Sequence, residues 1–264
     1  MRVIVLTHGG AEIVLEKLHD LKNIEIVGVF VETVTTPSRS LAEKIRRSIK
    51  YDGVFETVKK LFPKTDGGRA QTTVGATVEI ADELGVTVYE VDNFHSETSI
   101  AIMRKADADL GVIYGTNIIK ENVFSIPKLG SINLHQGRAP HYRGGPPIFW
   151  ELFNGEKEIG ITVHFVASKV DTGDIILQKI LSLKYDFAYG ARFEEFIASF
   201  QMGLREESAN LVAESVKLIA TGNVERKPQD TSIGKRYRLP VKKEKDEMRW
   251  RLLQRMNRDA NAKD

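Results

Sequence analysis

Two polar side chains stand two residues apart where an apolar run ends, in the stretch SINLH that closes on Asn133, Leu134 and His135. In a strand, residues two apart point to the same side, so Asn133 and His135 can face one site. An amide can donate a hydrogen bond to a developing oxyanion, and an imidazole can move protons near neutral pH. The competing interpretation is a buried Asn and His that are hydrogen-bonded to backbone.

A carboxylate that could complete such a site is Asp171, which lies 36 residues after His135 in the turn VDTGD. A carboxylate beside an imidazole favours its cation and fixes its orientation. Asp near Gly is also common turn chemistry, so Asp171 alone is a weak signal. Together, two residues at a strand end and one loop carboxylate predict a catalytic site.

Short apolar runs and helix-like segments alternate along most of the chain and must position these residues. This pattern predicts a doubly wound, mostly parallel, Rossmann-like α/β sheet, which binds ligands beyond the carboxyl ends of its strands. We expect strands at 2–7, 24–31, 87–91, 109–115, 130–135, 159–167 and 174–183, and helices at 11–21, 77–86, 98–108, 146–155 (with Pro at its start), 192–220 and 246–258. Between them, 40–64 is expected to form one or two helices on or beside the sheet, and 64–75 a mobile loop.

The glycine pair Gly9-Gly10 follows the first expected strand. A dinucleotide site would have the pattern G-x-G-x-x-G there, which this chain lacks. One interpretation is a tight turn. The other is a small anionic or polar substrate bound near His8, Gly9 and Gly10, because N–H groups at a helix N-terminus bind anions.

The composition narrows the chemistry further. The chain has no cysteine, which excludes disulfides, thiolate metal sites and cysteine nucleophiles. The opening apolar run is too short for a signal peptide, and no run approaches the roughly 18 residues of a membrane span, so we expect a cytoplasmic protein without membrane contact. Residues 235–264 hold eleven Lys and Arg against five acidic residues, which indicates either a solvated helix or a patch for an anionic partner.

The segments GSINLH, YRG and VDTGDIILQ together resemble the catalytic domain of the folate-dependent formyltransferases, a family that includes enzymes acting on glycinamide ribonucleotide, on methionyl-tRNA and on amino sugars. The resemblance is strong over 81–178 and looser over 1–222. It implies a catalytic domain over 1–222 and a basic extension with a short helix over 223–264.

The resemblance also implies a mechanism. An amine attacks the formyl carbon of 10-formyltetrahydrofolate, Asn133 and protonated His135 stabilise the oxyanion, and Asp171 raises the pKa of His135 and helps to move the amine proton. No metal is required. The pterin is expected against the residues that match the family's folate loops, which are Asn117, Ile118, Ile119, Val166, Ala167 and Val170. The acceptor is expected near His8, Gly9, Gly10, Tyr142 and Arg143.

Departures from the family pattern bear on the acceptor. Gln136 stands where Pro often follows the His, and His8-Gly9-Gly10-Ala11 replaces the phosphate loop of the glycinamide ribonucleotide enzyme. The transfer-RNA enzyme has a C-terminal β-barrel, whereas 223–264 is expected to be loop and helix, and the formyltetrahydrofolate hydrolase has an additional N-terminal domain. By elimination, we expect an amino sugar linked to a nucleotide.

Two alternatives remain open at the C-terminus. The expected last helix carries Met248, Leu252, Leu253 and Met256, which pack either on the same chain or on a partner in a homodimer. The basic tail could also make the chain a nucleic-acid-binding module, although nucleic acid is not the partner we expect.

Overall fold

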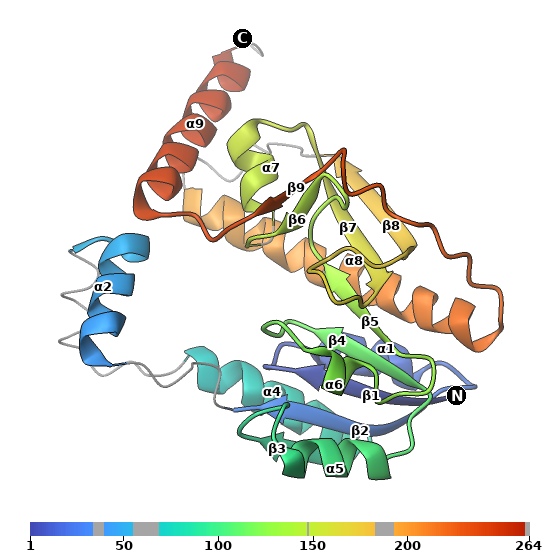
Figure 1. The fold of residues 1–264 in the computed structure, drawn as a ribbon. Coiled ribbons are helices and arrows are strands. Elements are labelled where there is room, and N and C mark those ends of the chain that lie inside the picture. The colour runs from blue at the N-terminus through green and yellow to red at the C-terminus, as the bar shows by residue number, and fades with distance from the viewer. Residues whose placement is uncertain (34–39, 55–68, 147, 183–192, 262–264) are drawn as a thin grey trace.

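The computed structural model describes residues 1–33, 40–54, 69–146, 148–182 and 193–261, which form an α/β fold around one large sheet (Figure 1). Its strands are β1 (Arg2–Thr7), β2 (Glu25–Glu32), β3 (Val88–Val91), β4 (Leu110–Tyr114), β5 (Ser131–His135), β7 (Glu158–Phe165) and β8 (Ile175–Ser182). They are ordered β3-β2-β1-β4-β5-β7-β8. The first five are parallel, whereas β7 pairs antiparallel with both β5 and β8. The expected mostly parallel, doubly wound sheet is confirmed.

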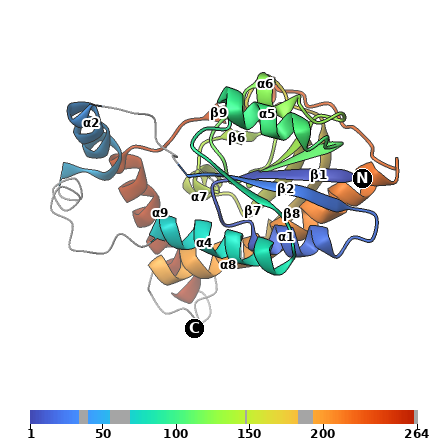
Figure 2. The ribbon, with the colours of Figure 1, turned by 90° about the horizontal axis from the view of Figure 1, so that it is seen from below.

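Helices cover both faces of this sheet (Figure 2). On one face lie α1 (Glu12–His19), α4 (Arg69–Glu83) and α8 (Phe193–Ala220), and on the other lie α5 (Glu97–Lys105) and the short α6 (Glu121–Phe124). The central strands β1 and β4 are almost continuously buried, which is why they read as unbroken apolar runs rather than as alternating ones. Among the helices of the described residues, none combines the length and the apolar character needed to cross a membrane.

The prediction of a loop at 64–75 is wrong from residue 69 onward, because the helix α4 begins at Arg69. Residues 55–68 lie outside the described part of the chain. Thr77 of α4 anchors this helix, since its hydroxyl donates to Glu12 and accepts from the backbone N–H groups of Gly10 and Ala11. These contacts come from α1, distant in sequence, so local composition could not reveal them.

The helix α2 (Leu41–Asp52) confirms helical structure within 40–64, and it lies beside rather than over the sheet, which is one of the two expected placements. It stands beside the body of the molecule and contacts the C-terminal helix α9 (Lys242–Asn261), with Lys245 and Asp52 forming an ion pair of 3.3 Å (Figure 1). Helix α9 is longer than the predicted 246–258. Its Met248 and Leu252 are buried within the same chain, where α9 packs on α7 (Phe149–Asn154).

The helix α7 starts later than the sequence predicts. Pro146 lies outside it, and the residue before Phe149 is Ile148, whose φ is +65°. Its predicted end is confirmed, because Gly155 adopts the left-handed conformation at the C-cap with a φ of +84°.

A second, two-stranded sheet was not predicted. The strand β6 (Tyr142–Gly144) pairs in parallel with β9 (Lys235–Tyr237), although more than ninety residues separate them (Figure 1). Because β6 follows the Asn133–His135 strand end, this pairing brings part of the expected extension over the predicted site. The division of the chain at residue 222 stays a prediction.

A buried carboxylate supports the loop between β5 and β6. Glu151 of α7 is 2% exposed, and its Oε1 accepts the backbone N–H of Arg138 at 3.0 Å. Burial raises the pKa of Glu151 to about 7, although the N–H groups of Arg138 and Gly160 partly oppose the shift. The loop that leads from His135 to β6 is therefore held by a group that titrates near neutral pH.

The docking of α9 can be tested with Leu252→Ala. Leu252 is 1% exposed, so truncation should lower the free energy of unfolding by about 2–5 kcal/mol, measured by urea denaturation. Trp250→Ala is the matched control, since Trp250 is 62% exposed on the same helix, and it should change that free energy by roughly 0.5 kcal/mol or less. Equal effects of the two substitutions would contradict the packing of α9 described here.

The ionisation of Glu151 predicts a pH-dependent stability. A carboxyl whose pKa is raised on folding contributes stability below its unfolded pKa of 4.5, and loses that contribution as pH rises through about 7. The free energy of unfolding of Glu151→Gln should therefore vary less with pH between 4.5 and 7.5 than that of the wild type, by up to about 3 kcal/mol. Glu158→Gln, at an exposed site, should retain the wild-type dependence; a Glu151→Gln profile parallel to the wild type would disprove the assignment.

Candidate active site

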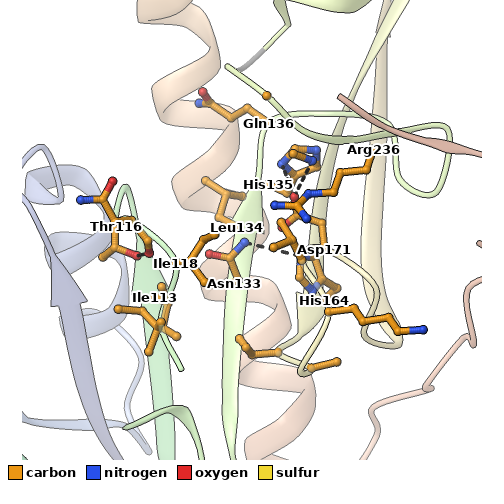
Figure 3. Close-up of a pocket in the computed structure, with 18 of the residues that line it drawn as sticks. Ile113, Thr116, Ile118, Asn133, Leu134, His135, Gln136, His164, Asp171 and Arg236 are labelled. Carbon is orange, nitrogen blue, oxygen red and sulfur yellow. Dashed lines mark hydrogen bonds and ion pairs between the residues drawn. The ribbon is translucent and has the colours of Figure 1, made fainter. Parts of the chain in front are cut away.

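A cavity of about 500 Å³ opens beyond the carboxyl ends of β4 and β5, where an open α/β sheet binds ligands (Figure 3). Its walls come from four regions: the end of β4 and the loop after it, the end of β5, the loop between β7 and β8, and the β6–β9 ribbon. The lining includes Gly115, Thr116, Asn117, Ile118, Ile119, Asn133, His135, Gln136, Gly144, His164, Val166, Ala167, Lys169, Val170, Asp171, Arg236, Tyr237 and Leu239.

The three predicted catalytic residues converge on this cavity (Figure 3). His135 Nδ1 lies 3.5 Å from Asp171 Oδ2, and both side chains are 11% exposed. His135 Nε2 lies 2.6 Å from the carbonyl oxygen of Tyr142, so Nε2 carries a proton and donates it to that oxygen. Asn133 precedes His135 by two residues on β5, and its side chain lines the same cavity.

A further histidine, His164 of β7, completes the cluster and was not singled out from the sequence. It pairs with Asn133 across the β5–β7 ladder, and its Nε2 lies 3.4 Å from Asn133 Nδ2 and 3.4 Å from Asp171 Oδ1. Its Nδ1 donates to the carbonyl oxygen of Phe165 at 2.8 Å. A signal did exist, because His164 is the lone ionisable residue in the apolar run IGITVHFVA.

Asp171 is held in an unusual backbone conformation, with a φ of +51°. Asp tolerates this left-handed region better than most residues. The backbone N–H of Gly144 donates to Asp171 Oδ2 at 2.8 Å, so β6 fixes the carboxylate from the side opposite His164.

These contacts determine the charge of Asp171. Burial alone would raise its pKa, but the hydrogen bond with His164, the charges of His135 and His164, and the Gly144 N–H outweigh burial. The pKa of Asp171 is therefore held well below its usual range, and the carboxylate is ionised at neutral pH.

The expectation that Asp171 raises the pKa of His135 is only half right. Burial lowers the pKa of His135, and it outweighs the upward effects of Asp171 and of the Tyr142 carbonyl; the charge of His164 lowers it further. The net direction is a lowered pKa, so burial favours the neutral form of His135 in the free protein. Burial is a property of the fold, which spacing in the sequence does not express.

The six residues expected against the pterin all line this cavity, namely Asn117, Ile118, Ile119, Val166, Ala167 and Val170. Ile118 is 64% exposed although it is large and apolar. An uncovered apolar side chain on a cavity wall, beside backbone groups of two loops, is suited to a flat heterocycle. The cavity volume is also in the range that small-molecule ligands require. The residues present therefore fit a folate, while their individual roles stay predictions.

The residues expected near the acceptor are placed less favourably. His8, Gly9 and Gly10 are not among the residues that line this cavity. His8 Nε2 instead contacts Glu32 at 2.7 Å, and the N–H of Gly10 is engaged by Thr77 Oγ1 at 3.0 Å. The N–H group expected to meet an anion is thus already occupied, so anion binding here would require Thr77 to withdraw.

Tyr142 and Arg143 of β6, which were expected near the acceptor, make hydrogen bonds within the protein. Tyr142 offers its carbonyl oxygen to His135, and its hydroxyl donates to Glu156 at 2.7 Å. Arg143 donates to the carbonyl oxygens of Pro140 and Thr231, which fastens β6 to the C-terminal segment. Neither side chain contributes to the main cavity.

The C-terminal segment instead supplies residues that no sequence signal identified. Arg236, Tyr237 and Leu239 line the cavity, because β9 pairs with β6. Gln136, the residue that departs from the family pattern, also lies on its wall, and its amide donates to Ser208 of α8 at 3.1 Å. Within the described ranges, no group of three or more histidine or acidic side chains is arranged to hold a metal ion.

Comparison with known structures shows the same fold. The phosphoribosylglycinamide formyltransferase of Anaplasma phagocytophilum superposes with a TM-score of 0.58 at 20% identity, covering 84% of this chain and 88% of that one. A sugar N-formyltransferase from Shewanella sp. FDAARGOS_354 superposes with a TM-score of 0.52 at 15% identity, covering 90% and 76%. At these identities, the likeness concerns the fold alone.

Sequence comparison establishes the relationship. The methionyl-tRNA formyltransferase of Chlorobium limicola is 36% identical over 168 residues, which is 64% of this chain and 50% of the relative. That of Fusobacterium nucleatum is 31% identical over 224 residues, or 84% and 67%. The chain thus spans between half and two thirds of the length of these relatives. The family model described as formyl transferase matches residues 1–187, and the chain belongs to the formyl transferase family.

Proposed function

We propose that this protein transfers a formyl group from 10-formyltetrahydrofolate to an acceptor amine, with an amino sugar linked to a nucleotide as the leading acceptor. The observation that carries the proposal is the convergence of Asn133, His135 and Asp171 on one cavity whose other wall fits a folate. Membership of the formyl transferase family supports the reaction class.

In this proposal, the amine nitrogen bonds to the formyl carbon, and the bond between that carbon and N10 of the folate breaks. The chain supplies hydrogen bonds and a proton acceptor, and the proton that His135 takes from the amine passes to N10 of the departing tetrahydrofolate. The Asn133 amide donates to the formyl oxygen as negative charge develops on it. Burial favours the neutral form of His135, and in that form it can take a proton from the amine. The atom that gains this proton is Nδ1, because Nε2 already carries one and donates to Tyr142.

Asp171 then acts through its charge. Nδ1 lies 3.5 Å from Asp171 Oδ2, so the imidazolium forms beside a carboxylate that is already ionised. Its low pKa makes Asp171 a weak base, and we therefore assign it to orienting His135 and stabilising the cation rather than to removing the proton directly. For His135 to donate to the formyl oxygen, it must release either Tyr142 or Asp171.

Methionyl-tRNA is the second candidate acceptor. The curated relatives that are 30–36% identical carry that activity in their names, and the C-terminal segment is basic. The amino sugar remains our first choice because residues 235–261 form the strand β9 and the helix α9, which pack on β6 and α7 and are not part of a β-barrel. A hydrolase that releases formate to water is the third.

The reaction is tested by measuring tetrahydrofolate formation from 10-formyltetrahydrofolate with four separate additions: nucleotide-linked amino sugars, glycinamide ribonucleotide, methionyl-tRNA and no acceptor. We expect turnover with an amino sugar, and a loss on the order of 10²-fold or more in kcat for His135→Ala and for Asn133→Ala. His141→Ala, an exposed histidine in the following loop, is the matched control and should retain the wild-type rate.

The outcomes separate the candidates. Turnover with methionyl-tRNA alone would replace the sugar assignment, and formate release that needs no acceptor would favour the hydrolase. No turnover with any addition, or full activity in His135→Ala, would overturn the proposal.

A further inference from the structure

We infer that Arg236 binds an anionic group, a phosphate or diphosphate, on the acceptor amine. This inference rests on the proposed function and names a chemical property of its substrate. It starts from the cavity itself, whose lining includes two permanent cations, Lys169 and Arg236, and one carboxylate, Asp171.

The Arg236 guanidinium is unpaired among the residues that the structure describes. The guanidinium is exposed to the cavity, and within the described ranges its side chain makes no hydrogen bond or ion pair. The neighbouring cation Arg143 differs, since two carbonyl oxygens satisfy it. A guanidinium presents five donors in a planar fork that matches phosphate and carboxylate oxygens, so an unpaired one on a cavity wall is suited to an anion.

The backbone holds Arg236 at this place. The β6–β9 pairing sets Arg236 opposite Arg143, one residue from Gly144, whose N–H fixes Asp171. Gly144 has a φ of +62°, and a Cβ there would lie 3.3 Å from Arg236 Cγ. The glycine therefore both permits the turn and leaves room for the arginine stem beside the catalytic carboxylate.

The position of Arg236 favours the acceptor over the folate as the source of the anion. In Figure 3, Arg236 lies beside His135 and Asp171, across Asn133 from Thr116 and Ile118, which belong to the expected pterin wall. Lys169, the other cation, belongs to the loop before Asp171, on the expected folate side. An amine that reaches His135 from the Arg236 side would place its substituents against this guanidinium.

The strand β9 provides a matched control. Lys235 precedes Arg236, and its side chain lies in a separate depression with Arg138 and His141 instead of in the catalytic cavity. Lys235→Gln thus removes one exposed cation from the same strand at a position that does not itself line the catalytic cavity, although the Lys235 ammonium lies over the ring of Tyr237.

The experiment measures dissociation constants of inorganic pyrophosphate and of folinic acid by isothermal titration calorimetry, for wild type, Arg236→Gln, Arg236→Lys and Lys235→Gln. We expect pyrophosphate to bind at least about tenfold more weakly to Arg236→Gln, and to an intermediate degree to Arg236→Lys, because lysine keeps the charge but loses the fork. Lys235→Gln should match the wild type, and folinic acid should bind all four proteins equally.

Two pyrophosphate results would overturn the inference: no binding to the wild type, or equal affinity in wild type and Arg236→Gln, whether or not Lys235→Gln loses affinity. Weakened folinic acid binding in Arg236→Gln with unchanged pyrophosphate binding would also overturn it, because the arginine would then serve the carboxylates of the folate. If folinic acid fails to bind the wild type while pyrophosphate binding depends on Arg236, the anion site stands and the proposed function fails.

Discussion

The site depends on one buried carboxylate that must stay charged. Asp171 lies between two imidazoles and accepts the N–H of Gly144, so four parts of the chain have to meet around it: β5, β6, β7 and its own turn. Without these contacts, burial would favour the protonated acid. The Asp171 side chain is largely buried, so hydrogen bonds and the neighbouring imidazoles, rather than water, stabilise its negative charge.

This constraint explains the charge states of the neighbours. Burial favours the neutral form of His135, yet His135 lies beside a fixed anion that stabilises its cation once a proton arrives. Such a pair suits a group that must first accept a proton and then hold it. Gly144 of β6 donates its N–H to Asp171 and also lies beside the stem of Arg236. The catalytic residues and the outer wall of the cavity are therefore both positioned by the β6–β9 ribbon.

The sequence predicted what short-range patterns determine. Buried parallel strands give unbroken apolar runs, so the sheet and the position of Asn133 and His135 at its edge could be predicted. Long-range contacts could not be predicted: Thr77 of α4 bonds to Gly10, Ala11 and Glu12, and β9 pairs with β6 from the far end of the chain. His164 was overlooked because a single histidine in an apolar strand usually belongs to the core. The upward effect of Asp171 on the pKa of His135 was predicted, whereas the opposing effect of burial was not.

The most direct test of the account is Asp171→Asn, which keeps the shape of the side chain and its ability to accept from Gly144 while it removes the charge. Formyl-transfer kcat and the dissociation constant of folinic acid should be measured for this variant and the wild type under the same conditions. We predict a fall in kcat on the order of 10²-fold or more with nearly unchanged folinic acid affinity, because the charge stabilises the His135 cation and not the bound folate. A variant that keeps the wild-type kcat would contradict the account.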